Sequence, residues 1–200
     1  MNTARYVLAV AGIVGLPPAI VYWLILHPFV GFWRKAGKTV TYVTLTIVFI
    51  AVGGAVYLVR DPILAVDYGT NRWLWIPAIL CYLATVWIQI RIRRQLTFRV
   101  LAGVPELDED GKGGTLLMDG LYARIRHPRY TGVIVGMLAF AFFTNYLAMY
   151  LLVPVSALGL ALIVRVEERE LEARFGEEYR QYRARVPMFI PRFGSRPAAG

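Results

Sequence analysis

Two polar stretches stand at either end of the last long apolar segment of the chain. The first reads Gly-Leu-Tyr-Ala-Arg-Ile-Arg-His-Pro-Arg-Tyr over residues 120–130, and the second reads Glu-Glu-Arg-Glu-Leu-Glu over residues 167–172. Together they hold an imidazole, several guanidinium groups, paired carboxylates and two phenols, which can bind a cation, pack on a planar ring or donate hydrogen bonds. The two stretches are therefore the candidates for one polar binding site.

The local sequence indicates how two of these groups are held. Pro128 disfavours helical geometry at the residue before it, so we expect the His127 ring at a fixed break in the backbone. Glu167 follows a long apolar run, where a carboxylate is costly unless Arg126, Arg165 or a bound cation pairs with it. Each feature alone is also typical of a membrane anchor or a solvated helix end. Their occurrence together, at the two ends of one apolar segment, favours a functional site.

The apolar segment between the two stretches predicts a helical hairpin over residues 131–166, with a turn at Asn145. Its first arm gives about 21 Å of helix at 1.5 Å per residue, short of a hydrocarbon core about 30 Å thick. The second arm is long enough to cross. Because both ends of a hairpin lie on one side, we expect His127 and Glu167 at the same face of the membrane, although they are far apart in sequence.

The composition of the whole chain is typical of an integral membrane protein. Of its 200 residues, 58% are hydrophobic and 18% are charged, against about 45–50% and about 25% in soluble domains. The apolar residues form long runs and the charges fill the gaps, which predicts a single all-α membrane domain over residues 1–200. Three spans are predicted within residues 1–90, at 6–26, 40–59 and 73–90, and the hairpin brings the number of transmembrane helices to about five.

The basic residues predict the orientation of these spans. The remaining segments are a loop over residues 91–130, which carries the first polar stretch, and a tail over residues 167–200. The positive-inside rule places both in the cytoplasm and the N-terminus outside. We expect the membrane to be the cytoplasmic membrane rather than that of the endoplasmic reticulum. The net charge of +9 is accordingly assigned to membrane headgroups rather than to nucleic acid. The basic clusters that follow the first and third runs are Arg34, Lys35 and Lys38, and Arg91, Arg93, Arg94 and Arg99.

The order of the motifs resembles a known family. Arg126-His127-Pro128-Arg129-Tyr130, an apolar hairpin, Glu167-Glu168, and then Phe-Gly-Glu-Glu-Tyr at residues 175–179 are similar to the isoprenylcysteine carboxyl methyltransferases. That family belongs with the membrane phospholipid methyltransferases. The resemblance is specific over about residues 115–187, and the three N-terminal spans match only in kind. It implies an S-adenosylmethionine pocket on the cytoplasmic side, with the acceptor entering sideways from the lipid.

The resemblance also implies roles for individual residues. Glu167 matches the acidic cofactor ligand and Arg129 falls at the variable position of the cofactor motif. Related carboxyl methyltransferases have an arginine four residues before the acidic ligand, where this chain has Ile163, and Arg165 is the nearby alternative. The implied catalytic residues are Arg165 and Glu167, no metal ligand is implied, and the implied cofactor-binding residues are Thr115, Leu116, Leu117, Tyr122, His127, Pro128, Tyr130, Glu167 and Glu168.

Methyl transfer to a lipid-like or small amphiphilic acceptor is the function that this resemblance implies. A sulfonium methyl group is already activated, so such an enzyme mainly holds donor and nucleophile in line and excludes water. We expect carboxyl O-methylation ahead of N-methylation of a phospholipid amine, because an amine must first lose a proton. S-methylation of a small thiol is a third acceptor chemistry. A non-catalytic membrane subunit with a retained pocket is the alternative of another class, and the oligomeric state is not predicted.

Overall fold

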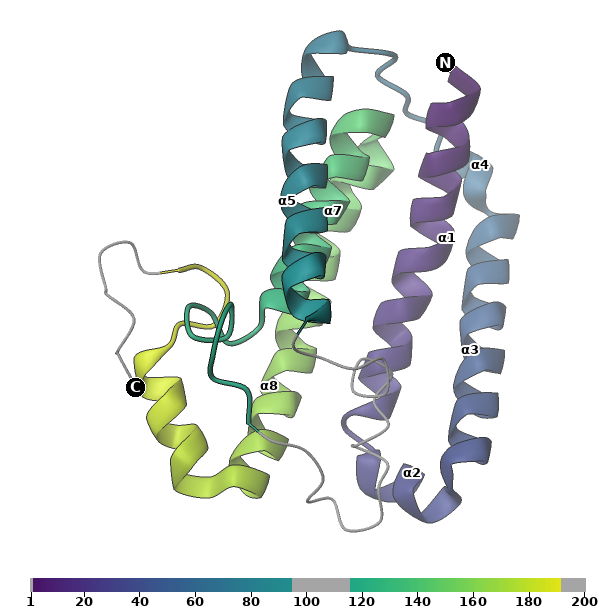
Figure 1. The fold of residues 1–200 in the computed structure, drawn as a ribbon. Helices are drawn as coiled ribbons and strands as arrows, with labels where there is room; N and C mark the ends of the chain where they lie inside the picture. The colour runs from purple at the N-terminus through teal and green to yellow at the C-terminus, as the bar shows by residue number, and fades with distance from the viewer. Residues whose placement is uncertain (1, 95–115, 192–200) are drawn as a thin grey trace.

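The computed structural model describes residues 2–94 and 116–191 (Figure 1). Within these two ranges the chain is built from helices, and the β-type pairing is limited to one isolated antiparallel bridge between Asp67 and Tyr146. The predicted all-α fold is therefore confirmed. In chain order the helices are α1 (Asn2–Leu26), α2 (Val30–Ala36), α3 (Lys38–Leu58), α4 (Arg60–Ile63), the 3-10 helix η1 (Arg72–Leu74), α5 (Trp75–Arg93), α7 (Pro128–Thr144) and α8 (Leu147–Arg185).

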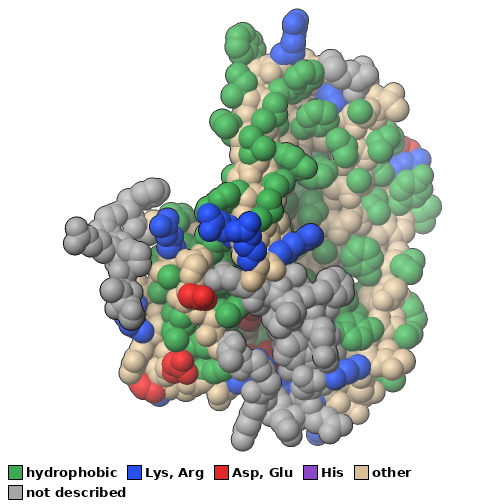
Figure 2. All heavy atoms as spheres, in the orientation of Figure 1, with side chains coloured by type: hydrophobic (Ala, Val, Ile, Leu, Met, Phe, Trp, Pro, Cys, Tyr) green, Lys and Arg blue, Asp and Glu red, His purple; other side chains and the backbone are tan. Residues whose placement is uncertain are grey.

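Four of the described helices are long and apolar enough to cross a membrane, namely α1, α3, α5 continued from η1, and α8. Their outer surfaces are apolar: Leu58, Trp73 and Leu158 are each at least 70% exposed. Figure 2 shows hydrophobic side chains over the upper part of the molecule, whereas most of the visible carboxylates lie towards its lower end. Large apolar side chains exposed on these helices are stable in lipid and costly in water. The protein is an all-α integral membrane protein.

The hairpin is formed by α7 and α8, and α7 is the shorter arm with 17 residues. It begins at Pro128, three residues before the predicted start, because proline has a helical φ and needs no hydrogen-bond partner for its nitrogen in a first turn. At 1.5 Å per residue it spans about 25 Å, close to the thickness of a hydrocarbon core. The turn is at Asn145, as predicted, in a left-handed conformation with φ 56°.

Two glycines let α7 approach α5 closely. A Cβ atom built on Gly132 would lie 3.0 Å from Cγ2 of Ile88, and one on Gly136 would lie 3.3 Å from Cγ2 of Thr85. The Thr85 hydroxyl donates a hydrogen bond to the carbonyl oxygen of Gly132 at 3.2 Å. In lipid, helices associate through such close contacts, since no hydrophobic effect drives them together. The contact fixes α7, and with it the break at its N-terminus, against α5.

α1 lies between α3 and the hairpin (Figure 1) and contacts α3, α7 and α8. It is a single helix in which Pro17 and Pro18 are both accommodated. Near its C-terminal end, Trp23 packs against a buried apolar cluster made by the hairpin. This cluster, which forms one wall of the candidate site described below, consists of Tyr130, Leu160, Ile163 and Val164.

A buried arginine fastens the other end of the bundle. Arg5, at the start of α1, is 1% exposed, and its Nε donates a hydrogen bond to the carbonyl oxygen of Thr144 at 2.8 Å. Its guanidinium also pairs with Asp67, in the loop before η1, and lies 5.3 Å from the ring centroid of Tyr146. A buried charge is tolerated when it is paired and hydrogen-bonded in this way. We call this contact the N-terminal lock, because it joins α1, the loop and the hairpin turn.

The charged start of the tail is helical, as its sequence predicts for residues 167–182, and only the end of the tail differs from its prediction. α8 continues to Arg185, with one interruption at Gly176, where φ is 56° and ψ is −125°. Glycine adopts a positive φ without steric cost, so the chain bends there and its last turns fold back (Figure 1). The following residues, predicted to form a loose terminus, instead pack against the loop before α7 as far as Phe189. Residues 192–200 lie outside the described part of the chain.

Candidate functional site

The candidate site forms where the loop before α7 meets α8. His127 precedes the first residue of α7 and has a non-helical backbone with φ −124° and ψ 59°, which confirms the break predicted from Pro128. Its side chain is 5% exposed. The break therefore directs a buried imidazole at the adjacent helix rather than along α7.

The imidazole of His127 lies against two neighbouring carboxylates of α8. Its Nε2 atom is 3.1 Å from Oε1 of Glu168, a hydrogen-bond distance. Its Nδ1 atom is 3.8 Å from Oε2 of Glu167, which is too long for a hydrogen bond. The hairpin thus brings the two polar stretches together at one end of the bundle, as predicted, and Glu168 rather than Glu167 holds the ring.

Arg126 completes the network around Glu168. Its Nε and Nη2 atoms both lie 2.8 Å from Oε1 of Glu168, and both side chains are 8% exposed. Its Nη1 atom donates hydrogen bonds to the carbonyl oxygens of Arg183, at 3.0 Å, and Val186. A buried carboxylate with two cationic or polar donors is held in a single position. Glu168 therefore has its partners within the protein and acts to orient His127.

Backbone hydrogen bonds fasten the C-terminal segment over this network. The amide nitrogen of Arg126 donates to the carbonyl oxygen of Pro187 at 2.9 Å, and that of His127 donates to Met188 at 3.1 Å. The ring of Phe189 lies 6.1 Å from the His127 ring, and Tyr130 lies 5.9 Å from it on another side. The segment 187–189 and α7 together cover the imidazole with aromatic rings.

One buried oxygen atom at the site, Oε2 of Glu167, has no hydrogen-bond partner among the described residues, and the buried hydroxyl of Tyr179 lies close to Glu168. An unsatisfied buried polar group costs about 1–3 kcal/mol. Such an atom at a site with an imidazole and a second carboxylate fits a polar ligand that supplies the missing hydrogen bond.

Tyr122 adds a neutral donor to the same site. Burial, together with the charge of Glu167, raises the pKa of Tyr122 to about 12, while the charge of Arg129 acts in the opposite direction. The phenol therefore stays protonated at physiological pH and can donate a hydrogen bond. The carbonyl oxygen of Tyr122 accepts a hydrogen bond of 2.7 Å from the hydroxyl of Tyr182, which joins this loop to the end of α8.

The structure gathers most of the residues that the sequence singles out, with four exceptions. Thr115 lies outside the described residues, and Leu116 and Leu117 are half-buried in the loop that leads to Tyr122. Arg165 is on the exposed side of α8, whereas Ile163 is buried with 1% exposure. The residues brought together around the imidazole are Tyr122, His127, Pro128, Tyr130, Glu167 and Glu168.

Three parts of the site were not predicted. Arg126 was weighed as a partner of Glu167, but it pairs with Glu168. Tyr179 was noted only as part of a motif, and the segment 187–189 was expected to be loose. Gly176 is the feature of the sequence that bears on these parts. A glycine inside a charged helical pattern marks a place where the helix can bend back.

A second histidine–carboxylate contact lies one turn further along α8. Nδ1 of His27 is 3.8 Å from Oε2 of Glu170, and Arg34 pairs with Oε1 of the same carboxylate at 3.2 Å. The ring of His27 stacks on Trp23 with centroids 5.2 Å apart. This contact ties the end of α1 and the short helix α2 to α8. Among the described residues, no group of three or more His, Cys, Asp and Glu side chains is placed to hold a metal ion.

Comparison with known proteins gives one family match. The sequence model of the phospholipid methyltransferase family matches residues 73–178, which include α5, α7 and the site on α8. This is over half of the chain, and it covers both polar stretches. No solved structure matches the chain.

Three curated relatives show how far the likeness extends. A methanethiol S-methyltransferase of Bradyrhizobium diazoefficiens is 41% identical over 36% of this chain and 24% of its own length. A protein-S-isoprenylcysteine O-methyltransferase of Schizosaccharomyces pombe is 35% identical over 40% of this chain and 34% of its own length. The cobalt-zinc-cadmium resistance protein CzcN of Cupriavidus metallidurans is 30% identical over 62% of this chain and 56% of its own length. The chain thus spans between about a quarter and somewhat over half of these relatives.

Proposed function

Because the chain belongs to the phospholipid methyltransferase family, we propose that it is a membrane methyltransferase that uses S-adenosylmethionine and acts on a lipid-like or small amphiphilic acceptor. One observation in particular supports this proposal: the buried carboxylate oxygen of Glu167 lacks a hydrogen-bond partner among the described residues, beside an imidazole that is itself firmly held by Glu168.

The residues of the site fit S-adenosylmethionine. When bound, this cofactor supplies an activated methyl group on a positively charged sulfur. The free oxygen of Glu167 can accept a hydrogen bond from its ammonium or hydroxyl groups. Its carboxylate and ring nitrogens can accept hydrogen bonds from the hydroxyls of Tyr122 and Tyr179. Thr115, Leu116 and Leu117 would lie along it through the backbone, and Pro128 and Tyr130 would pack against it.

The chain's own contribution to methyl transfer is to position the reactants and exclude water. Glu168 and Arg126 orient His127, and the aromatic rings of Tyr130 and Phe189 close two sides of the imidazole. Glu167 is the candidate catalytic residue, since it would contact the cofactor. Such positioning contributes several kcal/mol when donor and acceptor are held in line. Arg165 is a second candidate, at the exposed surface of α8 where an acceptor could pair with it.

Carboxyl O-methylation is the acceptor chemistry that we propose first. A carboxylate is already a nucleophile, so it requires no base, and the described site contains no second buried histidine beside Glu167 to serve as one. S-methylation of a small thiol is the second candidate, because four methanethiol S-methyltransferases are 32–41% identical over 36–38% of this chain. N-methylation of a phospholipid amine remains the alternative within the family.

The site is proposed to face the cytoplasm. The C-terminal end of α1, the N-terminal ends of α3 and α7, and the charged part of α8 all lie at one end of the bundle (Figure 1). Arg34, Lys35, Arg91 and Arg93 lie at helix ends there. Since cytoplasmic flanks are rich in arginine and lysine, this end is the cytoplasmic one, and the N-terminus lies outside.

Product analysis tests the proposal. The purified chain is incubated in lipid vesicles with S-adenosylmethionine carrying a labelled methyl group and with a carboxylate, thiol or amine amphiphile. A base-labile labelled product establishes a methyl ester, whereas a stable one indicates transfer to sulfur or nitrogen, which mass spectrometry separates. If folded wild-type protein gave no labelled product with any of the three acceptors, and so did not differ from the Glu167→Gln variant, a non-catalytic subunit would be favoured.

A further inference from the structure

The short helix α2 has one side that packs into the bundle and one side that is exposed. Trp33 on the inner side is 8% exposed, and its Nε1 donates a hydrogen bond of 3.0 Å to the carbonyl oxygen of Ile25. The same ring packs against a buried cluster of α1 and α3 side chains. Arg34 pairs with Glu170 of α8 at 3.2 Å. These contacts tie α2 to three helices, so its outer side keeps a fixed direction.

The outer side of α2 combines aromatic and basic side chains. Phe29, just before the helix, is 59% exposed, and Phe32 is 62% exposed. Lys35 is exposed and lies three residues after Phe32, on the same side of the helix. Lys38, at the start of α3, is exposed as well. Exposed aromatic rings are costly in water and ammonium groups are costly in hydrocarbon. Their combination is typical of a segment that lies in the interface between the two.

The length of α3 places α2 at a membrane boundary. α3 (Lys38–Leu58) has 21 residues, which at 1.5 Å per residue is about 31 Å, close to a hydrocarbon core about 30 Å thick. Lys38 is therefore expected at one boundary of that core. α2 comes directly before it and joins the lower ends of α1 and α3 (Figure 1), which puts it in the headgroup layer.

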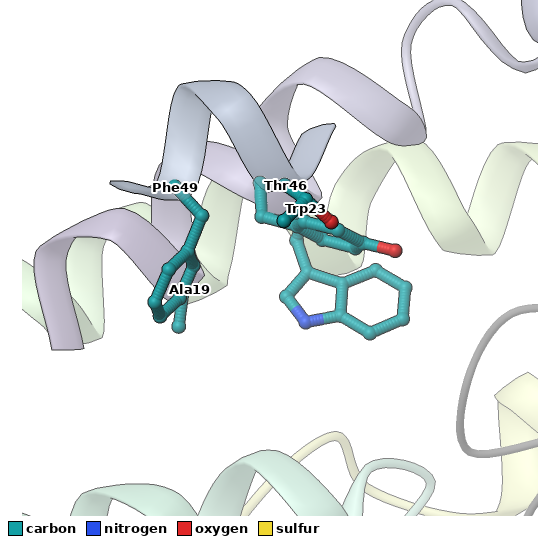
Figure 3. Close-up of a pocket in the computed structure, with 5 residues that line it drawn as sticks. Ala19, Trp23, Thr46 and Phe49 are labelled. Atoms are coloured by element: carbon teal, nitrogen blue, oxygen red, sulfur yellow. The ribbon is translucent and has the colours of Figure 1, made fainter. Parts of the chain in front are cut away.

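An apolar cavity between α1 and α3 marks the hydrocarbon side of this boundary (Figure 3). It has a volume of about 300 Å3, and its wall includes Phe49, which is 38% exposed. None of the described residues that line it is charged. Thr46 in its wall lies eight residues, or about 12 Å of helix, beyond Lys38. The surface thus changes from an uncharged wall to exposed lysines within about half of the hydrocarbon thickness. The lining residues are Ala19, Tyr22 and Trp23 of α1 and Thr46 and Phe49 of α3.

We propose that α2 is an interfacial helix that binds the headgroups of anionic lipids through Lys35 and Lys38. Phe29 and Phe32 insert among the first acyl-chain carbons of the same leaflet. The lysine ammonium groups attract the negative charge of the headgroups, and the aromatic rings hold the helix at the depth where the two meet. The surface lies outside the family match over residues 73–178, and the inference does not depend on the methyltransferase function proposed above.

Photolabelling from the headgroup layer tests the lipid preference. The full-length protein is placed in phosphatidylcholine vesicles with a trace of phosphatidylglycerol or phosphatidylcholine that carries a diazirine in its headgroup, and adducts are mapped by peptide mass spectrometry. We expect residues 29–38 to be labelled at least about fivefold more by the anionic probe, since each basic residue near the surface contributes about that factor. The preference should weaken in about 1 M salt.

Charge variants identify the residues that are responsible. Lys35→Gln combined with Lys38→Gln should reduce the preference to less than about twofold. The matched pair Lys35→Arg and Lys38→Arg keeps both charges and should retain it. Arg91→Gln combined with Arg93→Gln removes two exposed charges at the end of α5 and should leave the labelling of residues 29–38 unchanged. Equal labelling by the two probes, or an equal loss in the α5 variant, would overturn the assignment.

Nitroxide labels test the depth of the aromatic residues. In a Cys81→Ser background, which removes the single cysteine of the chain, labels are placed at Phe32→Cys, Ile47→Cys and Glu177→Cys. Ile47 is 61% exposed on the membrane-spanning α3, and the Glu177 side chain is 64% exposed in the charged part of α8. The label on α2 should be less accessible to a water-soluble nickel chelate than the label at position 177, and more accessible than the label at position 47. Accessibility equal to that at position 177 would place α2 in water and contradict the proposal.

Discussion

Nε2 of His127 lies 3.1 Å from Oε1 of Glu168, although 41 residues separate them in the chain. The contact exists because α7 and α8 form a hairpin whose two ends meet at one face of the bundle. It also gives two adjacent carboxylates different roles. Glu168 is fully engaged by His127 and Arg126, while Glu167 keeps an oxygen atom that no described residue satisfies.

This difference in roles predicts that two neighbouring substitutions have unequal effects on stability. Glu168→Gln removes one partner from a buried ionic network, so we expect a loss of about 3–5 kcal/mol in stability and a lower unfolding temperature. Glu167→Gln should cost about 1 kcal/mol or less, because that side chain has no salt bridge of hydrogen-bonding length to lose. Thermal unfolding in detergent measures both. Equal destabilisation by the two variants would show that the carboxylates share one structural role.

The N-terminal lock predicts a dependence of stability on pH. Burial alone would raise the pKa of Asp67, but hydrogen bonds from Arg5 and from the Gly69 amide outweigh it and lower the pKa. A lowered carboxylate pKa stabilises the fold above the unfolded value of about 3.9, and this stabilisation is lost as the pH falls through the folded pKa.

We therefore expect the unfolding temperature to fall below about pH 4 in the wild type, and Asp67→Asn to reduce that fall. Since the Asp67 side chain is 36% exposed, solvent screening keeps the effect small. The control is Asp61→Asn, at a carboxylate that is 70% exposed, which should unfold as the wild type does. If the unfolding temperature of Asp67→Asn depended on pH as that of the wild type does, ionisation of Asp67 would not contribute to the stability of the N-terminal lock.

The glycine contact between α5 and α7 predicts a steric effect. Gly132→Leu forces a side chain into the space occupied by Ile88, where even a Cβ atom would lie 3.0 Å from Cγ2, so we expect a loss of about 1–3 kcal/mol. Gly54→Leu, on α3, is the matched control because nothing lies within 4 Å of its Cβ position. Unfolding in mild detergent compares the two. If Gly54→Leu destabilised the protein as much as Gly132→Leu, helix packing would not be the cause.

Tyr122 offers a test of hydrogen bonding to the cofactor. With a pKa raised to about 12 by burial and the charge of Glu167, its phenol is a donor throughout the physiological pH range. Tyr122→Phe removes the hydroxyl and keeps the ring, so affinity for S-adenosylmethionine should fall about fivefold, as expected for loss of about 1 kcal/mol. The wild-type affinity should also show no change from ionisation of this phenol up to about pH 10. Unaltered affinity in Tyr122→Phe would place the hydroxyl outside the cofactor site.

Much of the fold was predictable because its signals are local. Long apolar runs predict the helices, Asn145 predicts the turn, and Pro128 predicts the break that aims His127 at α8. The family resemblance rests on short motifs, each continuous in sequence, and the match over residues 73–178 confirms it.

The rest of the site depends on contacts between distant segments, which no local pattern encodes. The pairing of Arg126 with Glu168 rather than Glu167 is set by which side of α8 faces the loop. The bend at Gly176 lets residues 187–189 cover the imidazole. The prolines of the C-terminal segment predict a loose terminus and do not indicate this contact.

Calorimetric titration of S-adenosylmethionine into the detergent-purified protein tests the central claim most directly, with Glu167→Gln as the control that leaves the His127–Glu168 contact in place. The account predicts saturable binding to one site in the wild type and at least about tenfold weaker binding in the variant, as expected for loss of a hydrogen bond to a charged group. No binding to folded wild-type protein, or equal affinity in the two proteins, would contradict it.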